Sequence, residues 1–173
     1  SNLWRTDDGG ANWLSMSAVG GEVVDIHFTD SLRGYALTNT ALFLTTDGGS
    51  SWSEQSVDGV VSNGEMRRFY AANDSLWFIA NNAGLYRSTG GTWTQVQNIN
   101  FLIPPSTYEI VPGGGGLTLQ ADGQLYHATD AALETFEDKS LDNWPNLTAF
   151  DWLNDNTAYG ANGAALYKTD RKS

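Results

Sequence analysis

The clearest strand pattern in this chain lies between residues 23 and 57. Val23–Phe28 alternates apolar and polar residues, as expected of a half-buried strand, and Thr29–Gly34 breaks the alternation. Three more short apolar segments follow, each separated from the next by turn residues. They are Tyr35–Thr38, Leu42–Thr45 and Trp52–Val57. The pattern therefore predicts four short antiparallel strands joined by tight turns.

The same order of strands recurs along the rest of the chain. The first and second strands of the later repeats are expected at Arg67–Tyr70 and Leu76–Ala80, at Tyr108–Val111 and Leu117–Gln120, and at Thr148–Trp152 and Thr157–Tyr159. Turn residues rich in Asn and Gly separate the second strands from the third, at Asn81–Gly84, Ala121–Gln124 and Ala161–Ala164. Asn and Gly tolerate the positive φ that tight hairpins require. Their recurrence at one phase indicates a repeated supersecondary unit.

A leucine at the start of each third strand gives the period of this repeat. The leucines are Leu3, Leu42, Leu85, Leu125 and Leu166, spaced by 39, 43, 40 and 41 residues. A period near 40 in a chain rich in strand formers and glycine turns is typical of a β-propeller. We therefore predict an all-β fold, a β-propeller of four-stranded antiparallel blades, with about four blades present.

We predict one propeller segment over residues 1–173. Its repeats span approximately 3–41, 42–84, 85–124 and 125–165, with a partial repeat at 166–173. Both ends fall inside a repeat, and Leu166–Thr169 duplicates the strand position of Leu3–Thr6. We therefore expect this segment to belong to a larger propeller of roughly six to eight blades. A closed four-bladed ring and an oligomer of half-rings are the alternatives.

A short motif at the corner after the third strand resembles a known repeat. Thr6-x-Asp8-x-Gly10-x-x-Trp13 and Thr45-x-Asp47-x-Gly49-x-x-Trp52 resemble the Asp-box, or bacterial neuraminidase repeat, of sialidases, sortilin-type receptors and xyloglucanases. With Phe28-x-Asp30-x-x-x-Gly34-Tyr35-Ala36 upstream, the chain looks most like the photosystem II stability and assembly factor family. Later copies depart from the motif: one ends at Trp93 without the Asp, and one keeps Asp130 but has Phe136 in place of Trp.

The residues of this motif have a structural explanation. An Asp at a hairpin corner accepts backbone N–H groups, Gly supplies positive φ, and Trp packs the corner onto the blade. The residues expected in this role are Asp8, Gly10, Trp13, Asp47, Gly49, Trp52 and Trp93. The resemblance likewise implies that the motif lies away from the ligand face. Each loop offers too few carboxylates for the roughly six to eight oxygens that calcium takes, so we predict no metal and no cofactor.

Composition narrows the range of partners. Twenty acidic against nine basic residues give a net charge of −11, which repels nucleic acid and anionic lipid. No apolar run approaches the roughly 18 residues that a membrane-spanning helix needs, so we expect no membrane insertion. The chain has no cysteine, hence no disulfide framework and no thiolate site. We expect a secreted or periplasmic location, although this chain carries no signal peptide.

Two kinds of glycosidase site can be tested against the sequence. A sialidase needs three converging arginines, but the arginines left outside the repeat positions and the terminus are Arg33, Arg67 and Arg68. Arg67 and Arg68 are adjacent, so on a regular strand they face opposite ways. Other glycosidases need two carboxylates about 5 to 9.5 Å apart. The acids to consider are those in or beside first strands, which line a propeller's channel: Asp25, Glu109 and Asp151.

We expect these acids to be solvated or hydrogen-bonded carboxylates of the channel. His27 lies two residues from Asp25 on the same strand face and offers an Asp–His pair, but no motif places a serine for that pair to activate. We therefore predict no catalytic residue in this chain.

The sequence favours a non-catalytic propeller module that recognises a protein or a glycan. The candidate binding residues are Arg33, Arg67, Arg68, Asp25 and Asp151, with the apolar segment Ile99–Pro105 and the acidic segment Glu134–Trp144 as further candidates. The family resemblance implies an arginine-bearing face that meets a client protein, and the three arginines are the nearest equivalents. Further partners are the remaining blades of a parent chain or a second copy. The alternative is part of a secreted glycoside hydrolase, sialidase-like or xyloglucanase-like, whose catalytic residues lie mostly outside this chain.

Overall fold

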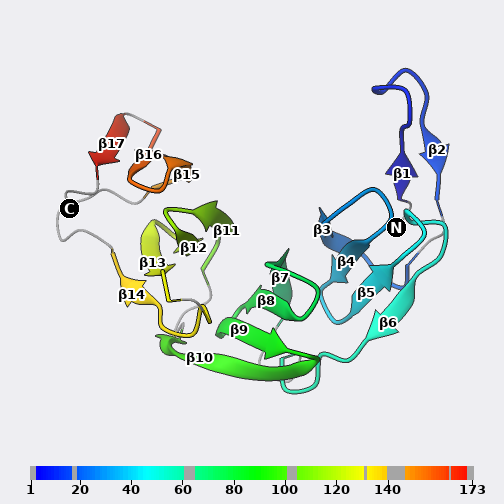
Figure 1. Ribbon diagram of the computed structural model, residues 1–173, viewed down its shortest axis with the longest axis horizontal. Helices are drawn as coiled ribbons and strands as arrows, with labels where there is room; N and C mark the ends of the chain where they lie inside the picture. The colour runs from blue at the N-terminus through cyan, green and yellow to red at the C-terminus, as the bar shows by residue number, and fades with distance from the viewer. Residues whose placement is uncertain are drawn as a thin grey trace. The chain divides into compact units, whose positions relative to one another are not determined.

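The computed structural model describes residues 3–16, 19–60, 65–100, 105–130, 132–139, 147–163 and 165–170. Within these ranges the regular secondary structure consists of the strands β1 to β17, without a helix (Figure 1). The predicted all-β fold is confirmed. The chain divides into two compact units, Ser1–Asn81 with Tyr86–Thr94 and Asn82–Leu85 with Gln95–Ser173.

The strands follow one another in antiparallel sheets. β1 (Trp4–Arg5) and β2 (Leu14–Ser15) form a two-stranded hairpin. The next sheet consists of β3 (Val23–Phe28), β4 (Gly34–Thr38), β5 (Leu42–Thr45) and β6 (Ser53–Gln55), in that order. A second four-stranded sheet consists of β7 (Met66–Ala71), β8 (Leu76–Asn81), β9 (Gly84–Thr89) and β10 (Thr92–Asn100). Each sheet therefore has the meander order that the repeat predicts for a blade.

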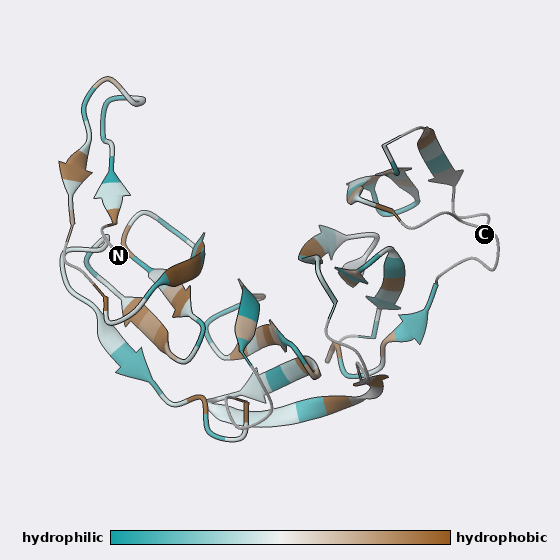
Figure 2. Cartoon of the chain, turned by 180° about the vertical axis from the view of Figure 1, so that it is seen from behind, coloured by the Kyte–Doolittle hydropathy of each residue, from teal (hydrophilic) through white to brown (hydrophobic). Residues whose placement is uncertain are grey.

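Two further sheets follow with the same order. One consists of β11 (Tyr108–Gly113), β12 (Gly116–Ala121), β13 (Gln124–Ala128) and β14 (Glu137–Asp138). The last is three-stranded among the described residues and consists of β15 (Ala149–Asn154), β16 (Thr157–Ala161) and β17 (Leu166–Asp170). Two of the outermost strands, β6 and β14, are polar, and Figure 2 shows them in the hydrophilic colour.

The hydrophobic core of each unit lies where neighbouring sheets face each other. In the first unit, the buried cluster joins Tyr35 and Leu37 of β4 to Met66 and Phe69 of β7 and to Trp77 of β8. In the second unit, the cluster contains Val111, Leu125, Leu147, Phe150 and Ala158. Apolar residues at every second strand position supply both clusters, because alternate side chains point to the same face of a sheet.

The outermost strand of the first complete sheet is shorter than predicted. The sequence indicated a strand over Trp52–Val57, whereas β6 ends at Gln55. The Ser56 carbonyl accepts a hydrogen bond from the Trp93 indole N–H at 2.9 Å, and Val57 is buried in the core cluster. The chain leaves the sheet at Ser56 because the core holds the residue that follows.

Three of the innermost strands contain an irregularity that the sequence analysis did not anticipate. The pairing register shifts between Val23 and Asp25 in β3, between Met66 and Arg68 in β7, and between Trp152 and Asn154 in β15. Such a bulge interrupts the strict alternation of side chains. The assumption that Arg67 and Arg68 point in opposite directions is therefore wrong for β7, since Arg67 is the extra residue.

The two candidate segments outside the repeat are only partly described. Residues 101–104 and 140–144 lie outside the described ranges, as does Ala164 of the last predicted turn. Ile99 is buried at the end of β10, and Phe136 is buried just before β14, which itself is exposed. Ile99 and Phe136 are therefore core residues, whereas Pro105 is half-buried.

Candidate functional site

The corner between β5 and β6 is held by the motif residues themselves. Asp47 Oδ1 accepts the Ser51 backbone N–H at 2.8 Å and the Thr45 hydroxyl at 2.8 Å, and its Oδ2 accepts the Ser51 hydroxyl at 2.6 Å. Thr45 Oγ1 in turn accepts the Gly49 N–H at 2.8 Å. Gly48 and Gly49 have φ of 68° and 89°, a conformation that residues with a Cβ rarely adopt. The motif closes its own turn.

The corner between β1 and β2 repeats this geometry. Asp8 Oδ1 accepts the Asn12 N–H and the Thr6 hydroxyl, both at 2.9 Å, and Oδ2 accepts the Asn12 amide at 2.6 Å. The Asn12 backbone N–H lowers the pKa of Asp8 to about 2, and the Ser51 hydroxyl does the same for Asp47. Hydrogen bonds that favour the charged form of a carboxylate lower its pKa. Both carboxylates therefore stabilise turns.

These lowered pKa values make the corners sensitive to acid. The pKa of Asp47 in the folded chain, about 2, lies below the ordinary aspartate value of 3.8. Its contribution to stability is therefore complete above about pH 4 and is lost as the pH falls toward 2. Asp47→Asn is expected to lower the melting temperature at pH 7, and the difference from the wild type should vanish near pH 2. Thermal melts at pH 7, 4 and 2 measure this.

Glu54→Gln on β6 removes one exposed carboxylate from a neighbouring strand and controls for the loss of charge. If Asp47→Asn and the wild type differed by the same amount at pH 2 as at pH 7, the carboxylate of Asp47 would not stabilise the corner.

The later copies of the motif keep part of this turn geometry and its hydrogen bonds. Gly90 and Gly91 have φ of 63° and 93° although the Asp is missing there, and the indole N–H of Trp93 donates to Ser56. Asp130 accepts the backbone N–H groups of Glu134 and Thr135, the former the larger cause of its lowered pKa. The corner is thus retained while its sequence varies.

Asp25 joins two neighbouring sheets of the first unit. Its Oδ1 accepts the Ile26 N–H and its Oδ2 accepts the Phe69 N–H of β7, each at 2.9 Å. His27 instead lies against the rings of Tyr70 and Phe69, with centroid distances of 5.3 and 6.2 Å. Within the described ranges, no hydrogen bond or ion pair joins the two side chains, although both contact Phe69. The Asp25–His27 pair that the sequence offered is therefore not formed.

The other two acids of the first strands occupy different positions. Glu109 pairs with Gln120 in β11–β12 as Asp25 pairs with Leu37 in β3–β4. Asp151, however, pairs with Tyr159, which corresponds to the pairing of His27 with Tyr35, and its Oδ1 accepts the Trp152 N–H at 2.8 Å. The first-strand acids therefore do not form a set at one level of the blades.

The three candidate arginines are also separated. Arg67 forms an ion pair with Glu65 at 2.7 Å, and Arg68 donates to the Arg67 carbonyl at 2.9 Å, both at the beginning of β7. Arg33 follows the end of β3 and forms an ion pair with Asp74, which lies beyond the end of β7, at 3.2 Å. The four residue steps from Arg67 to Ala71, the last residue of β7, span about 13 Å of strand. The structure therefore does not bring Arg33 together with the other two.

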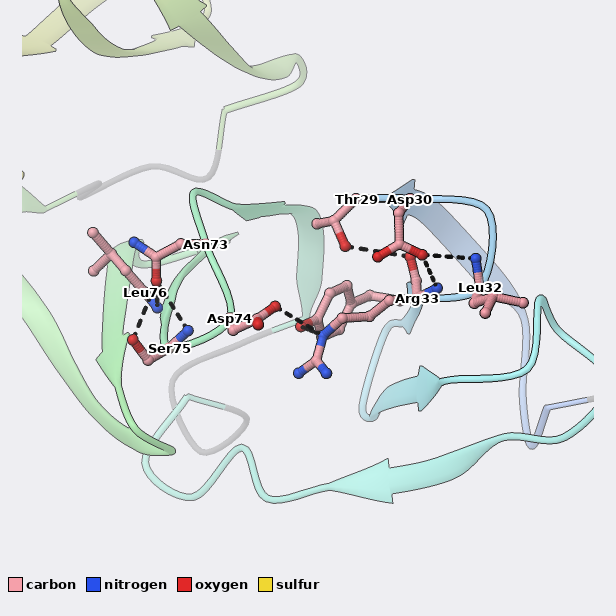
Figure 3. Close-up of polar contacts among 9 residues, drawn as sticks. Thr29, Asp30, Leu32, Arg33, Asn73, Asp74, Ser75 and Leu76 are labelled. Atoms are coloured by element: carbon pink, nitrogen blue, oxygen red, sulfur yellow. Dashed lines mark hydrogen bonds and ion pairs between the residues drawn. The ribbon is translucent and has the colours of Figure 1, made fainter.

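A second set of turns joins the first strand of a sheet to the second. The turn of residues 29–33, between β3 and β4, and the turn of residues 72–76, between β7 and β8, together form what we call the corner surface (Figure 3). Asp30 Oδ1 accepts the N–H groups of Leu32 and Arg33, both at 2.7 Å, and these bonds lower the pKa of Asp30, that to Arg33 the most. Asn73 Oδ1 accepts the N–H groups of Ser75 and Leu76 at 3.0 and 2.9 Å. The same Asx turn closes both hairpins.

Arg33 is the central cation of the corner surface. Its Nε lies 3.2 Å from both Asp74 Oδ1 and the Tyr35 hydroxyl, and its guanidinium carbon lies 6.0 Å from the centre of the Tyr35 ring. Within the described ranges no hydrogen bond or ion pair engages its two terminal nitrogens, which Figure 3 shows at the end away from these contacts. An anchored guanidinium with free terminal N–H groups suits bidentate recognition of oxygen acceptors.

Sequence reasoning selected Arg33 but missed Asp74, Tyr35 and the exposed Leu32 beside it. A usable signal was present, because Asp30-x-Leu32-Arg33 and Asn73-x-Ser75-Leu76 are the same turn in two repeats. What the sequence does not contain is the proximity of Arg33 to Asp74, 41 residues later.

The described ranges show neither a metal cluster nor a membrane-spanning helix. They contain no group of three or more His, Asp or Glu side chains placed to hold a metal ion. No helix long and apolar enough to cross a bilayer occurs in them.

The fold and its corners define a repeat protein of the β-propeller class. Residues 25–150 match the DUF6242 beta propeller domain, and the chain belongs to this family. A search of curated proteins returned no match. The predicted β-propeller is confirmed.

Solved propeller structures are similar to this chain. A structure described as YCF48 bound to D1 peptide superposes with a TM-score of 0.74 at 19% identity, covering 98% of this chain and 59% of that one. YCF48 from Cyanidioschyzon merolae gives 0.69 at 16% identity, covering 98% and 61%. An ancestral GH74 enzyme gives 0.62 at 17% identity, covering 88% and 23%.

These similarities concern the fold. They confirm the resemblance to photosystem II assembly factor propellers, and more distantly to xyloglucanase-type propellers, that the motif indicated. This chain spans about three fifths of the length of the YCF48 structures.

Proposed function

We propose that this chain is a non-catalytic propeller module that binds a protein ligand through the corner surface. The observation that carries the proposal is the state of Arg33, whose Nε is held by Asp74 and Tyr35 while its terminal nitrogens remain available. These nitrogens would donate to a carboxylate or to backbone carbonyls of the ligand.

The composition around Arg33 supports a protein ligand. Leu32 is an exposed apolar side chain next to it in the same turn, and Tyr35 lies below the guanidinium. Interface residues that contribute most to binding are enriched in Arg and Tyr, and anchored side chains lose little entropy on binding. The two Asx turns hold the backbone of the corner surface, so little of it has to be ordered when a ligand binds.

The geometry of the acids favours binding over catalysis. Asp25 accepts two backbone N–H groups, one from the neighbouring sheet, which is a structural use of its carboxylate. Glu109 and Asp151 occupy different positions along their strands, opposite Gln120 and Tyr159 respectively. A structure described as YCF48 bound to D1 peptide has a similar fold, and this likeness adds support for a peptide or protein ligand.

The proposal is tested by selecting peptide ligands and then measuring how the substitution of Arg33 by alanine changes their binding. Purified chain is used to select binders from a library of displayed peptides, and their Kd values are measured by calorimetry. Arg33→Ala is expected to weaken the selected peptides at least about tenfold, the effect of losing a charge-assisted hydrogen bond worth about 1.5 to 3 kcal/mol. Lys139→Ala, which removes a cation that is ion-paired with Glu137, is the matched control and should bind as the wild type does.

Three results would contradict the proposal. Peptides that bind Arg33→Ala as tightly as the wild type would place the site elsewhere. A glycan array that binds the chain when no peptide does would favour glycan recognition. Hydrolysis of sialosides or β-glucans that disappears in Asp25→Asn or Asp151→Asn would favour the glycoside hydrolase alternative.

A further inference from the structure

The corner surface places a hydrogen-bond acceptor beside its donors. Asp74 follows Asn73 in the turn between β7 and β8, and its side chain is 80% exposed. Its Oδ1 lies 3.2 Å from Arg33 Nε, as Figure 3 shows, whereas no hydrogen bond in the described part of the chain engages its Oδ2. The pair lies between two complete four-stranded sheets. An acceptor oxygen of Asp74 is therefore available beside the terminal N–H groups of Arg33.

The charge of the corner surface disfavours an acidic ligand. Its two turns carry one arginine, Arg33, against two aspartates, Asp30 and Asp74, in a chain with a net charge of −11. The backbone N–H groups of Arg33 and Leu32 lower the pKa of Asp30, so its carboxylate is charged at neutral pH. A ligand carboxylate drawn to Arg33 would come close to that of Asp74, and juxtaposed like charges strongly disfavour association.

An extended peptide backbone matches this donor and acceptor without adding charge. In an extended chain the N–H and C=O of one residue point to the same side, as in the hydrogen-bonded pairs of an antiparallel sheet. The C=O can accept from a terminal N–H of Arg33 while the N–H donates to Asp74 Oδ2. Each bond has one charged partner, and such bonds are stronger than those between neutral groups. The backbone of the ligand can therefore serve both side chains.

Leu32 gives the neighbouring contact an apolar character. It is 58% exposed and directly precedes Arg33 in the turn. Its backbone is held in place, because its N–H donates to Asp30 Oδ1 at 2.7 Å and its C=O accepts the Gly48 N–H at 2.8 Å. An apolar side chain of the ligand would remove part of Leu32 from water, which is favourable.

We propose that the corner surface recognises an extended peptide segment that lacks acidic residues, and that Asp74 determines this specificity. Arg33 binds a backbone C=O of the segment, Asp74 Oδ2 binds a backbone N–H, and Leu32 contacts an apolar side chain. The inference rests on the proposed function for the location of the site. It goes further in naming the backbone, and not a carboxylate, as the group that Arg33 binds.

The second unit contains an equivalent turn with a different partner. Asn154 Oδ1 accepts the N–H groups of Asn156 and Thr157, each at 2.9 Å, in the same Asx turn as those of the corner surface. Asp155 follows, and its Oδ1 accepts the Gly115 N–H at 3.1 Å. Gly115 directly precedes β12 and so occupies the position that the arginine has before β4. Asp155→Asn therefore changes an equivalent turn without a guanidinium at this position, and it is the matched control for Asp74→Asn.

Selection of displayed random peptides tests the specificity. Peptides are selected separately on the wild-type chain, on Asp74→Asn and on Asp155→Asn, and the selected sequences are compared. Those from the wild type and from Asp155→Asn should contain fewer Asp and Glu residues than the unselected library. Asp74→Asn keeps the shape of the side chain but removes its charge, so its peptides should be richer in Asp and Glu than those from the wild type.

Methylation of single backbone nitrogens tests the hydrogen bond to Asp74. Each amide of one peptide selected on the wild-type chain is N-methylated in turn, and Kd is measured by calorimetry. Methylation at one position should weaken binding at least about tenfold, the loss expected for a hydrogen bond to a charged group. The same methylation should have a much smaller effect on binding to Asp74→Ala, which lacks the acceptor, and an undiminished effect on binding to Asp155→Asn.

The outcomes separate this inference from the proposed function. If Arg33→Ala binds the selected peptides as the wild type does, or if the library yields no binder, both are overturned. If Arg33→Ala weakens binding but the wild-type peptides are enriched in Asp and Glu, the corner surface is the binding site and this inference alone fails. A methylation series on the wild-type chain without a sensitive position would also overturn it, and that series requires no variant of the chain.

Discussion

Replacing Tyr35 by alanine is expected to destabilise the first unit by about 3 to 5 kcal/mol, the usual cost of removing a buried aromatic ring. The ring is almost fully buried, with its centroid 4.7 Å from that of Phe69 and 5.5 Å from that of Trp77. It therefore joins β4 to both inner strands of the next sheet. Urea denaturation followed by tryptophan fluorescence measures the change, because Trp77 reports on the cavity.

Conservative variants at the same position separate the ring from its hydroxyl. Tyr35→Phe keeps the packing but loses the contact with Arg33, so it should cost only about 1 kcal/mol while weakening peptide binding at the corner surface. Tyr35→Leu should fall between the two. Stability of Tyr35→Ala within 1 kcal/mol of the wild type would show that this ring does not hold the two sheets together.

Replacing Thr118 by valine is the second change with a large expected effect, in the second unit. The Thr118 hydroxyl accepts the Trp152 indole N–H at 2.9 Å and lies 2.8 Å from His127 Nδ1. His127 Nε2 lies 3.2 Å from the Gly114 carbonyl, which can only accept, so Nε2 carries the proton and Nδ1 accepts from Thr118. One hydroxyl thus serves two side chains from two strands.

Valine has the same shape but leaves both partners without this hydroxyl. We expect Thr118→Val to lose about 2 to 4 kcal/mol, because each deprived polar group in a buried site costs about 1 to 3 kcal/mol. Thr118→Ser keeps the hydroxyl and should lose about 1 kcal/mol for the missing methyl group. Equal losses in the two variants, measured by urea denaturation, would contradict the role of the hydroxyl.

Local structure was predictable from the sequence where it depends on neighbouring residues. The strand Leu42–Thr45 was predicted with the bounds of β5, and Val23–Phe28 with those of β3. The sequence analysis also expected Asp47 to accept backbone N–H groups at a corner, and the structure shows its bond to Ser51. These features span only a few residues, so alternation and turn chemistry are sufficient to indicate them.

Contacts between sheets were not predictable in the same way. Asp25 was considered as a channel acid or the partner of His27, yet its carboxylate binds the Phe69 N–H 44 residues away. The register shift in β3, between Val23 and Asp25, is likewise absent from any local pattern. Such contacts arise from the way one sheet packs on the next, which a single sequence does not specify by spacing.

The sequence alone determined the repeat, the four-stranded unit and the corners, because each is a local choice between strand and turn made again about every 40 residues. Only the tertiary structure decided which side chains outside the repeat motif contact one another. It placed Asp74 and Tyr35 around Arg33, kept Arg67 and Arg68 at the other end of β7, and left Ile26 and Trp13 uncovered. These outcomes depend on the register and packing of neighbouring blades, where residues about 40 positions apart become adjacent in space.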